Sequence, residues 1–567
     1  MAFDLLIQNA RVVDGSGGPS FHGDVAVKDG KIVEVGKLNA QAKRVINAEG
    51  LVVSPGFIDN HCHYDAQVLW DPNCSFSCYH GSTTVIFGNC SLGLAPAKPE
   101  DRERIAGQLS YVEAIPMDVL NAGVNWNWRT YPEYMEVVGA RLGINAGTLI
   151  PHSAVRYYAM GEASQEDQRA ATPEQLATMK ALIREGMEAG ALGMSITRNR
   201  GHYDLEGRRI SGACAPDEEL FEVTDVLREM GTGVIQCGGG TGPEIDNRLL
   251  TRLSNACGRR IMYNSILQSA RAPERWKEHL AVVEEVAKAG SRAYPMASPN
   301  QIKQRFDGHN CQVFRGLTHW HSLMVSQDDQ EKLQAYSDRA LRDKLRGDLD
   351  VPLGPNAIFS KRWDLMVVEV PKLAKNQALK GKTVAEIAAS LGKDPLDTFL
   401  DIMVEEELDT VFVLTEINVD ADALSQILSS PYTVVGLSDG GAHVQFDSGV
   451  SYSTRLLGYW VREKGIMSLE EAVSQITFHS ASAFGIYDRG LIRPGLAADL
   501  AIWDAETISP VTEDIVHDFP NNGWRIREQA EGIEFTVVNG EVLVERGELT
   551  GALPGQVLHN AVYANSH

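Results

Sequence analysis

Short apolar segments that alternate with helical ones are the feature of this sequence that most constrains its fold. Between residues 57 and 295 they recur at regular spacing, and 173–189 is typical of the intervening helices. Such alternation predicts βα units around a parallel sheet. The sequence therefore predicts an α/β fold, a (β/α)8 TIM-like barrel. Its expected strands are 57–58, 83–88, 148–150, 193–196, 233–236, 260–263, 292–294 and 433–437.

The two ends of the chain read differently from this middle. Residues 4–53 and the region near 499–543 consist of short apolar strands, with turn signals at Asp14-Gly15, Asp29-Gly30 and Asn539-Gly540. We therefore expect both ends to build one small β-sandwich domain. The expected domains are a β-sandwich from 1–54 and 486–567 and a barrel from 55–485.

The spacing of the strands breaks once. About 135 residues separate the seventh expected strand from the eighth, whereas the earlier strands follow at regular intervals. We therefore expect an insertion before strand eight, at about 297–430. A chain of 567 residues is long enough for a barrel, a smaller domain and such an insertion.

Charge and composition exclude several classes of partner. The formal net charge is −23, so the basic footprint of a nucleic-acid or anionic-membrane binder is missing. No apolar stretch reaches the roughly 18 residues that span a bilayer, and the first residues lack a signal-peptide pattern. The 8 cysteines show no disulfide spacing. These observations predict a cytoplasmic protein with reduced thiols.

Residues of metal and acid–base chemistry stand where the expected strands end. His61 and His63 follow the first strand, and alternate residues of an extended chain point to the same side. Two neutral imidazoles side by side suit a divalent metal such as zinc. Cys90 follows the second strand and Asp439 the last. Because barrel active sites lie at the carboxyl ends of the strands, we expect these residues to meet there.

Beyond these single residues, long segments resemble the amidohydrolase superfamily, and within it the N-acyl-D-amino-acid deacylase (D-aminoacylase) family. The resemblance covers nearly the whole chain. The tail Asp488–Gly495 with Ala497–Leu500 is its most specific part. The other matching segments are Pro55–Asp59, His63–Gln67, Trp70–Pro72, His80–Val85, Gly88–Cys90, Gly190–Ser195 and Ser438–Gly440.

The resemblance implies a metal-dependent (β/α)8 hydrolase and a role for each strand-end residue. His61 and His63 resemble the metal ligands of the first strand. Cys90 matches a cysteine that stands where relatives carry a carboxylated lysine and that can bridge two metals. Asp439 matches a ligand that also handles protons. The chemistry agrees, because a divalent ion acidifies water and a nearby carboxylate can carry its proton to the leaving amine.

The chain departs from this family at two strand ends. Family members carry a histidine at the ends of strands five and six, where this sequence has Gly238 and Ile266. Cys237 is the strong donor nearby, and we consider it a candidate ligand. Three interpretations stay open: a mononuclear hydrolase, ligands recruited from the insertion, and a degraded metal site that binds without catalysis. The insertion offers His309, His319 and His321.

The residues expected to bind substrate also differ from the family pattern. Family members follow the last-strand aspartate with a His-Pro-Arg segment suited to a substrate carboxylate, whereas residues 441–447 contain no arginine. This favours a neutral or aromatic amide. For Arg156, pairing within the barrel is an equal alternative to substrate contact. The candidate substrate-binding residues are His152, Arg156, Tyr203, His319, His321 and His443.

Together these observations predict an enzyme. We expect a metal-dependent hydrolase of a non-peptide C–N bond, most simply an N-acyl amide, with Asp439 as proton shuttle. Cyclic-amide or carbamate hydrolysis is one alternative, and a non-catalytic ligand-binding relative is another. The expected cofactor is zinc, as one or two divalent ions. The expected partner is a small-molecule amide, and the sequence leaves homo-oligomer formation open.

Overall fold

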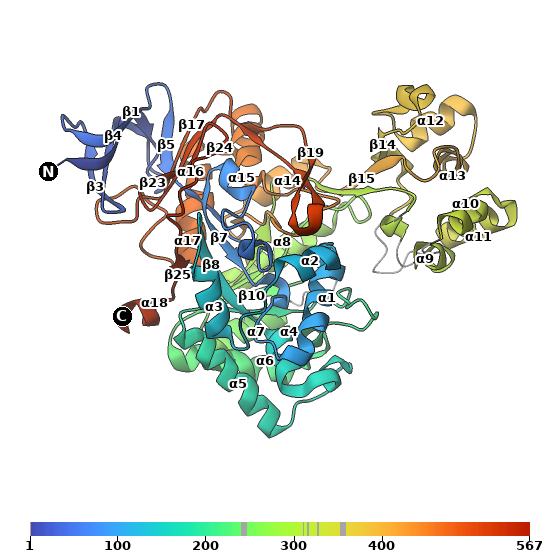
Figure 1. Ribbon diagram of the computed structural model, residues 1–567, viewed down its shortest axis with the longest axis horizontal. Helices are drawn as coiled ribbons and strands as arrows, with labels where there is room; N and C mark the ends of the chain where they lie inside the picture. The colour runs from blue at the N-terminus through green and yellow to red at the C-terminus, as the bar shows by residue number, and fades with distance from the viewer. Residues whose placement is uncertain are drawn as a thin grey trace. The chain divides into compact units, whose positions relative to one another are not determined.

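The computed structural model describes residues 2–239, 247–309, 311–314, 317–325, 328–351 and 359–566 (Figure 1). The chain divides into two compact units. The first comprises Met1–Ile266, Lys277–Asn300 and Ser425–His567, and the second Leu267–Trp276 and Gln301–Leu424. No helix among the described residues is long and apolar enough to cross a membrane.

The first unit contains a nine-stranded parallel sheet, of which eight strands lie in order at the positions that the sequence predicts. The ninth, β25 (Val557–Leu558), pairs with the third of these strands. The segments that follow the first and last strands meet through backbone hydrogen bonds: His63 N donates to Gly440 O (2.7 Å) and Asp439 N donates to His61 O (3.1 Å). These bonds bring the two ends of the sheet together, so the α/β barrel is confirmed. The strands in order are β6 (Phe57–Asp59), β7 (Ser82–Phe87), β8 (Asn145–Pro151), β9 (Gly193–Thr197), β10 (Val234–Gly238), β11 (Ile261–Tyr263), β12 (Ala293–Ala297) and β16 (Val434–Val435).

Helices follow the strands and pack on one another in series, α4 on α5, α5 on α6 and α6 on α7 (Figure 1). The predicted helix 173–189 is α5, which begins at Pro173 behind a capping box of Thr172 and Gln175. The helices of this unit are α1 (Arg102–Glu113), α2 (Met117–Gly123), α3 (Tyr131–Gly139), α4 (His152–Met160), α5 (Pro173–Glu188), α6 (Asp217–Met230), α7 (Asn247–Cys257), α8 (Arg275–Lys288), α15 (Tyr452–Arg455), α16 (Leu469–Ser474), α17 (Ser480–Ala483) and α18 (Ala561–Ser566).

Strands from both ends of the chain share a second sheet, and Figure 1 shows the blue N-terminal strands beside the red C-terminal ones. Its hairpins turn at Asp29-Gly30 (φ 50° and 75°) and Asn539-Gly540 (φ 46° and 82°), as type I′ turns require. No tight turn forms at Asp14-Gly15, because residues 13–20 make a longer connection. The strands are β1 (Phe3–Val12), β2 (Phe21–Lys28), β3 (Lys31–Gly36), β4 (Ala42–Asn47), β5 (Val52–Pro55), β17 (Leu500–Trp503), β22 (Ile533–Val538), β23 (Glu541–Glu545) and β24 (Glu548–Leu549). The sandwich and its borders at 54 and 486 stay a prediction.

The second unit has its own sheet and core. The strands β13 (Ile302–Phe306), β15 (Val411–Ile417) and β14 (Met366–Val370) pair in that order. Aromatic side chains fill the core, with the rings of Phe314 and Trp320 stacked 3.9 Å apart. The unit therefore folds around apolar contacts of its own. Its helices are α9 (Thr318–Val325), α10 (Asp329–Ser337), α11 (Arg339–Asp350), α12 (Val384–Leu391) and α13 (Pro395–Glu405).

Candidate metal centre

Four side chains meet at the carboxyl end of the barrel because the loops after three strands place them there. His61 and His63 follow β6, and Asp439 follows β16. After β7 the chain turns sharply through Gly88, where a side chain would lie 2.2 Å from Leu149 O. Only glycine fits this approach. The turn leads into Cys90, whose φ of 54° directs the loop back over the barrel.

The donor atoms of this group are spaced as ligands of one ion. His61 Nε2 lies 3.6 Å from Cys90 Sγ and 3.3 Å from Asp439 Oδ1. His63 Nε2 lies 3.8 Å from the same carboxylate oxygen. The ligand atoms of the two histidines and the cysteine all fall within 4.8 Å of one another. Ligands of a tetrahedral zinc ion lie about 3.3–3.6 Å apart, so the spacing suits a divalent ion.

Protonation also favours metal binding. Burial lowers the pKa of His61 to about 3 and holds the pKa of His63 well below its usual range, so both rings are neutral donors near pH 7. Burial, with the nearby carboxylates Asp439 and Glu113, raises the pKa of the Cys90 thiol well above its ordinary value. A metal ion deprotonates such a thiol on binding. The residues present therefore fit a divalent metal.

Asp439 combines an acid–base role with partial access to solvent. Burial raises the pKa of its carboxyl group to about 7, with the charge of Asp59 as a second cause. Its side chain is 28% exposed, whereas the side chain of His61 is fully buried. A carboxylate with a pKa near neutrality can both accept and return a proton. The geometry thus gives Asp439 the properties of a proton carrier beside the donor cluster.

Glu113 also belongs to this site, although sequence reasoning missed it. It ends α1, is 2% exposed, and places Oε1 3.4 Å from His63 Nδ1. Its backbone oxygen accepts a hydrogen bond from His443 N (2.7 Å). A carboxylate behind a metal-binding histidine fixes the ring and its tautomer. No signal in the single sequence separates this glutamate from a surface glutamate at a helix end.

Two strand ends that carry histidines in the resembling family carry an amide network here. Cys90 N donates to Gln236 Oε1 (2.7 Å), Gln236 Nε2 donates to Asn264 Oδ1 (2.7 Å), and Asn264 Nδ2 donates to Cys90 Sγ (3.3 Å). Gly238 packs directly on the cysteine, since an added Cβ would lie 2.8 Å from Cys90 Cα. Ile266 is buried. These positions supply no imidazole to a second ion.

His152 and Arg156 are occupied by a buried carboxylate. His152 Nε2 lies 3.0 Å and Arg156 Nε 2.8 Å from the same oxygen of Glu219. The two terminal nitrogens of Arg156 donate to backbone oxygens of Ser164, Ser211 and Arg169. The geometry therefore supports the alternative in which Arg156 pairs within the barrel, whereas substrate contact by these two residues stays a prediction.

Three further residues were candidates for metal or substrate binding. Cys237 is buried, its thiol faces Gly238 O at 3.6 Å, and it lies outside the donor cluster, so the predicted ligand role is not supported. His443 borders the site through its contact with Glu113, and its ring centroid lies 4.8 Å from that of Phe446. Tyr203 packs edge-on against Tyr111, with ring centroids 6.4 Å apart. Substrate contact by His443 and Tyr203 stays a prediction.

The insertion histidines that the structure describes form ion pairs within their own unit. Both ring nitrogens of His309 face carboxylates, Asp329 at 3.1 Å and Asp409 at 2.8 Å. Nδ1 of His319 lies 2.7 Å from Asp348 Oδ1. The side chain of His321 lies outside the described residues. The pairing of His309 leaves no free ring nitrogen, which argues against its recruitment as a metal ligand.

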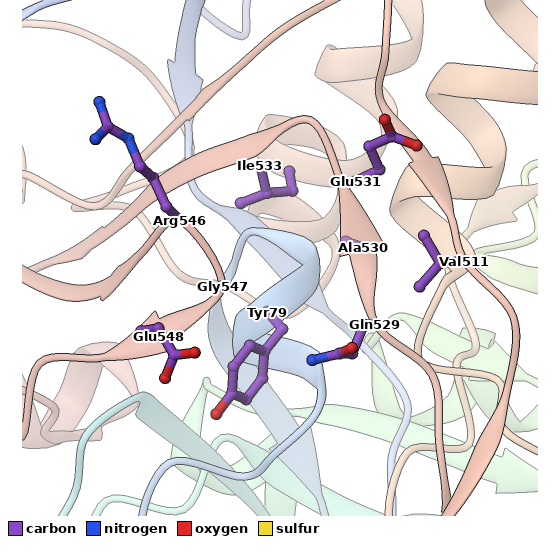
Figure 2. Close-up of a pocket in the computed structure, with 9 residues that line it drawn as sticks. All are labelled: Tyr79, Val511, Gln529, Ala530, Glu531, Ile533, Arg546, Gly547 and Glu548. Carbon is purple, nitrogen blue, oxygen red and sulfur yellow. The ribbon is translucent and has the colours of Figure 1, made fainter.

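The first unit contains several hollows among its described residues, and one of them borders the donor cluster. A cavity of about 20 Å³ borders Asp439, and Arg525 is the one cation among its lining residues. Arg525 is already paired with Asp518 Oδ1 at 2.8 Å and donates to Ser75 O at 2.6 Å. A larger hollow of about 340 Å³ is open to the surface beside Tyr79 (Figure 2). None of the residues that line the larger hollow belongs to the donor cluster.

Comparisons with known proteins agree with this geometry. The model of the amidohydrolase family matches residues 44–311 and 345–544. An uncharacterized protein of Mycobacterium tuberculosis is 29% identical over 97% of this chain and 93% of its own length. D-aminoacylase of Alcaligenes xylosoxydans xylosoxydans is 26% identical over 98% of this chain and 97% of its own. A solved D-aminoacylase structure superposes with a TM-score of 0.67 at 25% identity, covering 98% of this chain and 100% of the other. The chain therefore belongs to the amidohydrolase family, as a hydrolase of carbon–nitrogen bonds other than peptide bonds.

Proposed function

We propose that this protein hydrolyses N-acyl amides with the help of one zinc ion held by His61, His63, Cys90 and Asp439. The observation that carries the proposal is the convergence of these donors, with the histidine and cysteine atoms within 4.8 Å and Asp439 Oδ1 3.3 Å from His61 Nε2. Two neutral imidazoles and a thiolate suit zinc better than magnesium or calcium, which prefer oxygen ligands.

The chemistry divides between the ion and the carboxylate. When bound, a divalent ion polarises a carbonyl and acidifies water. Asp439 takes the proton of the attacking water and returns it to the leaving amine, for which its pKa of about 7 is suited. Glu113 Oε1 faces Nδ1 of His63 at 3.4 Å, where it can orient the ring. His61 is rigidly buried, so the donor geometry is set before substrate arrives.

The named relatives support an acyl-amide substrate. They include a D-aminoacylase, an N-acyl-D-aspartate deacylase and an N-acyl-D-glutamate deacylase, which are 26–28% identical to this chain. We extend the acyl-amide chemistry of these names to this protein. Hydantoinase structures at 14–17% identity share the fold alone, so cyclic-amide hydrolysis has no specific support. The intact donor cluster argues against the degraded, non-catalytic alternative.

The residues around the site favour an amide substrate that has no carboxylate to be bound by an arginine. Buried carboxylates stand close to the cluster, and burial raises the pKa of Asp65 to about 7 and that of Glu113 well above its usual range. Arg525, the one cation that lines the cavity beside Asp439, is paired already. The described residues that line the cavity beside Asp439 therefore offer no unpaired guanidinium that could bind a substrate carboxylate. We therefore expect neutral N-acyl amines to be cleaved at least as well as N-acyl-D-amino acids.

The test is a metal-supplemented hydrolysis assay on matched pairs of N-acyl amines and N-acyl-D-amino acids. Asp439→Asn should lower kcat by at least 100-fold with the fold retained, because the variant cannot accept the proton. Asp225→Asn, an exposed carboxylate on α6, is the matched control and should keep full activity. Full activity of Asp439→Asn, or no hydrolysis of any amide by the metal-loaded protein, would refute the proposal. A cytoplasmic location and homo-oligomer formation stay predictions.

A further inference from the structure

The hydrogen bonds around Cys90 form a closed ring of three. The backbone N–H of Cys90 donates to Gln236 Oε1 at 2.7 Å, and the amide of Gln236 donates in turn to Asn264 Oδ1 at 2.7 Å. The ring closes where Asn264 Nδ2 approaches Cys90 Sγ at 3.3 Å. Gln236 is fully buried and Cys90 is 5% exposed, so water does not compete freely for these bonds.

The direction of every bond in the ring follows from one group. A backbone N–H can only donate, so the side chain of Gln236 must present its oxygen to Cys90. Its NH₂ group then faces Asn264, which must present an oxygen in return. That leaves the NH₂ group of Asn264 facing the sulfur. Cys90 Sγ is therefore an acceptor on this side, whichever way the amides are first assigned.

Asn264 approaches the sulfur from the end of β11, one of the two strand ends where the resembling family carries a histidine. The lone pair there is taken by Asn264 Nδ2, and carboxamides are poor ligands for zinc. Gly238 contributes no side chain, and its Cα packs so closely that an added Cβ would lie 3.2 Å from Sγ. Sγ also faces His61 Nε2, at 3.6 Å. The sulfur therefore lies next to the imidazole of His61 and also accepts the amide hydrogen of Asn264.

We propose that Gln236 and Asn264 take the place of a second metal ion, holding Cys90 as a terminal thiolate ligand of a single ion. This inference rests on the proposed metal site. The N–H···S bond draws charge from the thiolate, so the ion keeps more of its positive charge for the substrate carbonyl. A solved D-aminoacylase is described as having a binuclear metal center with one-metal activation and second-metal attenuation, and this chain would lack the second position altogether.

The first experiment counts ions. The full-length protein, stripped with chelator, is equilibrated with a tenfold excess of zinc, passed through a desalting column and analysed by mass spectrometry for bound metal. We expect one zinc per chain. Two tightly held ions per chain would overturn the inference.

The second experiment measures the thiolate-to-cobalt absorption band of the cobalt-substituted protein. Cys90→Ser should abolish the thiolate-to-cobalt absorption band, and Cys237→Ser, a buried thiol outside the cluster, is the matched control that should leave it intact. Asn264→Ala removes the N–H···S bond, so it should move the band to longer wavelength and weaken zinc binding by about 10- to 100-fold.

These outcomes separate the inference from the proposed function. One bound ion with a thiolate band that does not move in Asn264→Ala would refute the role of the amide ring while leaving the hydrolase proposal intact. Absence of any bound metal, together with absence of amide hydrolysis, would refute both. A Gln236→Leu variant gives a second check, because loss of the partner that orients Asn264 should move the band in the same direction.

Discussion

Gly238→Ala tests whether close packing holds Cys90 in the donor cluster. The glycine has an ordinary backbone conformation, so alanine meets no torsional strain there. The added Cβ would lie 2.8 Å from Cys90 Cα and 3.1 Å from its Cβ, whereas ordinary contacts begin at 3.4 Å. Relief therefore requires a shift of about 0.6 Å, which exceeds the roughly 0.2 Å tolerance of metal–ligand distances. We expect a stability loss of about 1–3 kcal/mol from overpacking.

The same shift should weaken the metal site. Displacement of the thiolate should lower zinc affinity by about 10- to 100-fold, measured by competition with a chromophoric chelator at fixed pH. Gly347→Ala is the matched control. It lies in α11 with nothing within 4 Å of its added Cβ, so it should leave zinc affinity unchanged. Its stability should rise, because alanine is favoured over glycine in a helix by about 0.8–1 kcal/mol. Wild-type zinc affinity in Gly238→Ala would refute the reasoning.

Three further predictions follow from the site. Glu113→Gln should weaken zinc binding about 10- to 100-fold in the same chelator competition, because the carboxylate behind His63 is lost; unchanged affinity would contradict its positioning role. Glu219→Ala should lower the free energy of unfolding, measured in urea, by about 3–5 kcal/mol, because the buried charge of Arg156 loses its partner. KM of the folded enzyme should stay constant. A raised KM at unchanged stability would favour the substrate-contact interpretation. Because the pKa of Asp439 is raised from 3.8 to about 7, its contribution to the stability of the metal-free protein is complete below pH 3.8 and is lost as the pH rises through about 7. The metal-free protein should therefore melt at a lower temperature at pH 8 than at pH 6, and zinc should bind more tightly at pH 8. Asp439→Asn should reduce both dependences without removing them, because Asp65 and the Cys90 thiol also have raised pKa values. An unchanged slope in that variant would contradict the assignment.

The barrel was predictable because its strands are continuous apolar runs, each followed by a helix. Phe57 begins β6 and Thr172 caps α5, both signals that a single sequence carries. His61, His63, Cys90 and Asp439 were predictable as a group because strand ends of a barrel converge. Their distances were not, since they depend on loop turns such as the one at Gly88.

What escaped prediction depends on tertiary packing. Glu113 reaches the site from a helix that follows a long loop, and the sequence does not show which face of that helix is buried. The ring of Gln236 and Asn264 could not be predicted, because nothing local in the sequence indicates that their amides meet around Cys90. Arg156 was ambiguous for a similar reason. Its partner Glu219 lies 63 residues further along the chain.

The central claim is that a single divalent ion, bound by His61, His63, Cys90 and Asp439, makes this protein an N-acyl amide hydrolase. Titration of the metal-free protein with zinc, with the hydrolysis rate of an N-acyl amine followed at each addition, tests it most directly. The hydrolysis rate should rise linearly with added zinc and stop rising sharply at one equivalent. A rise that continues to two equivalents, or activity that does not depend on zinc, would contradict it.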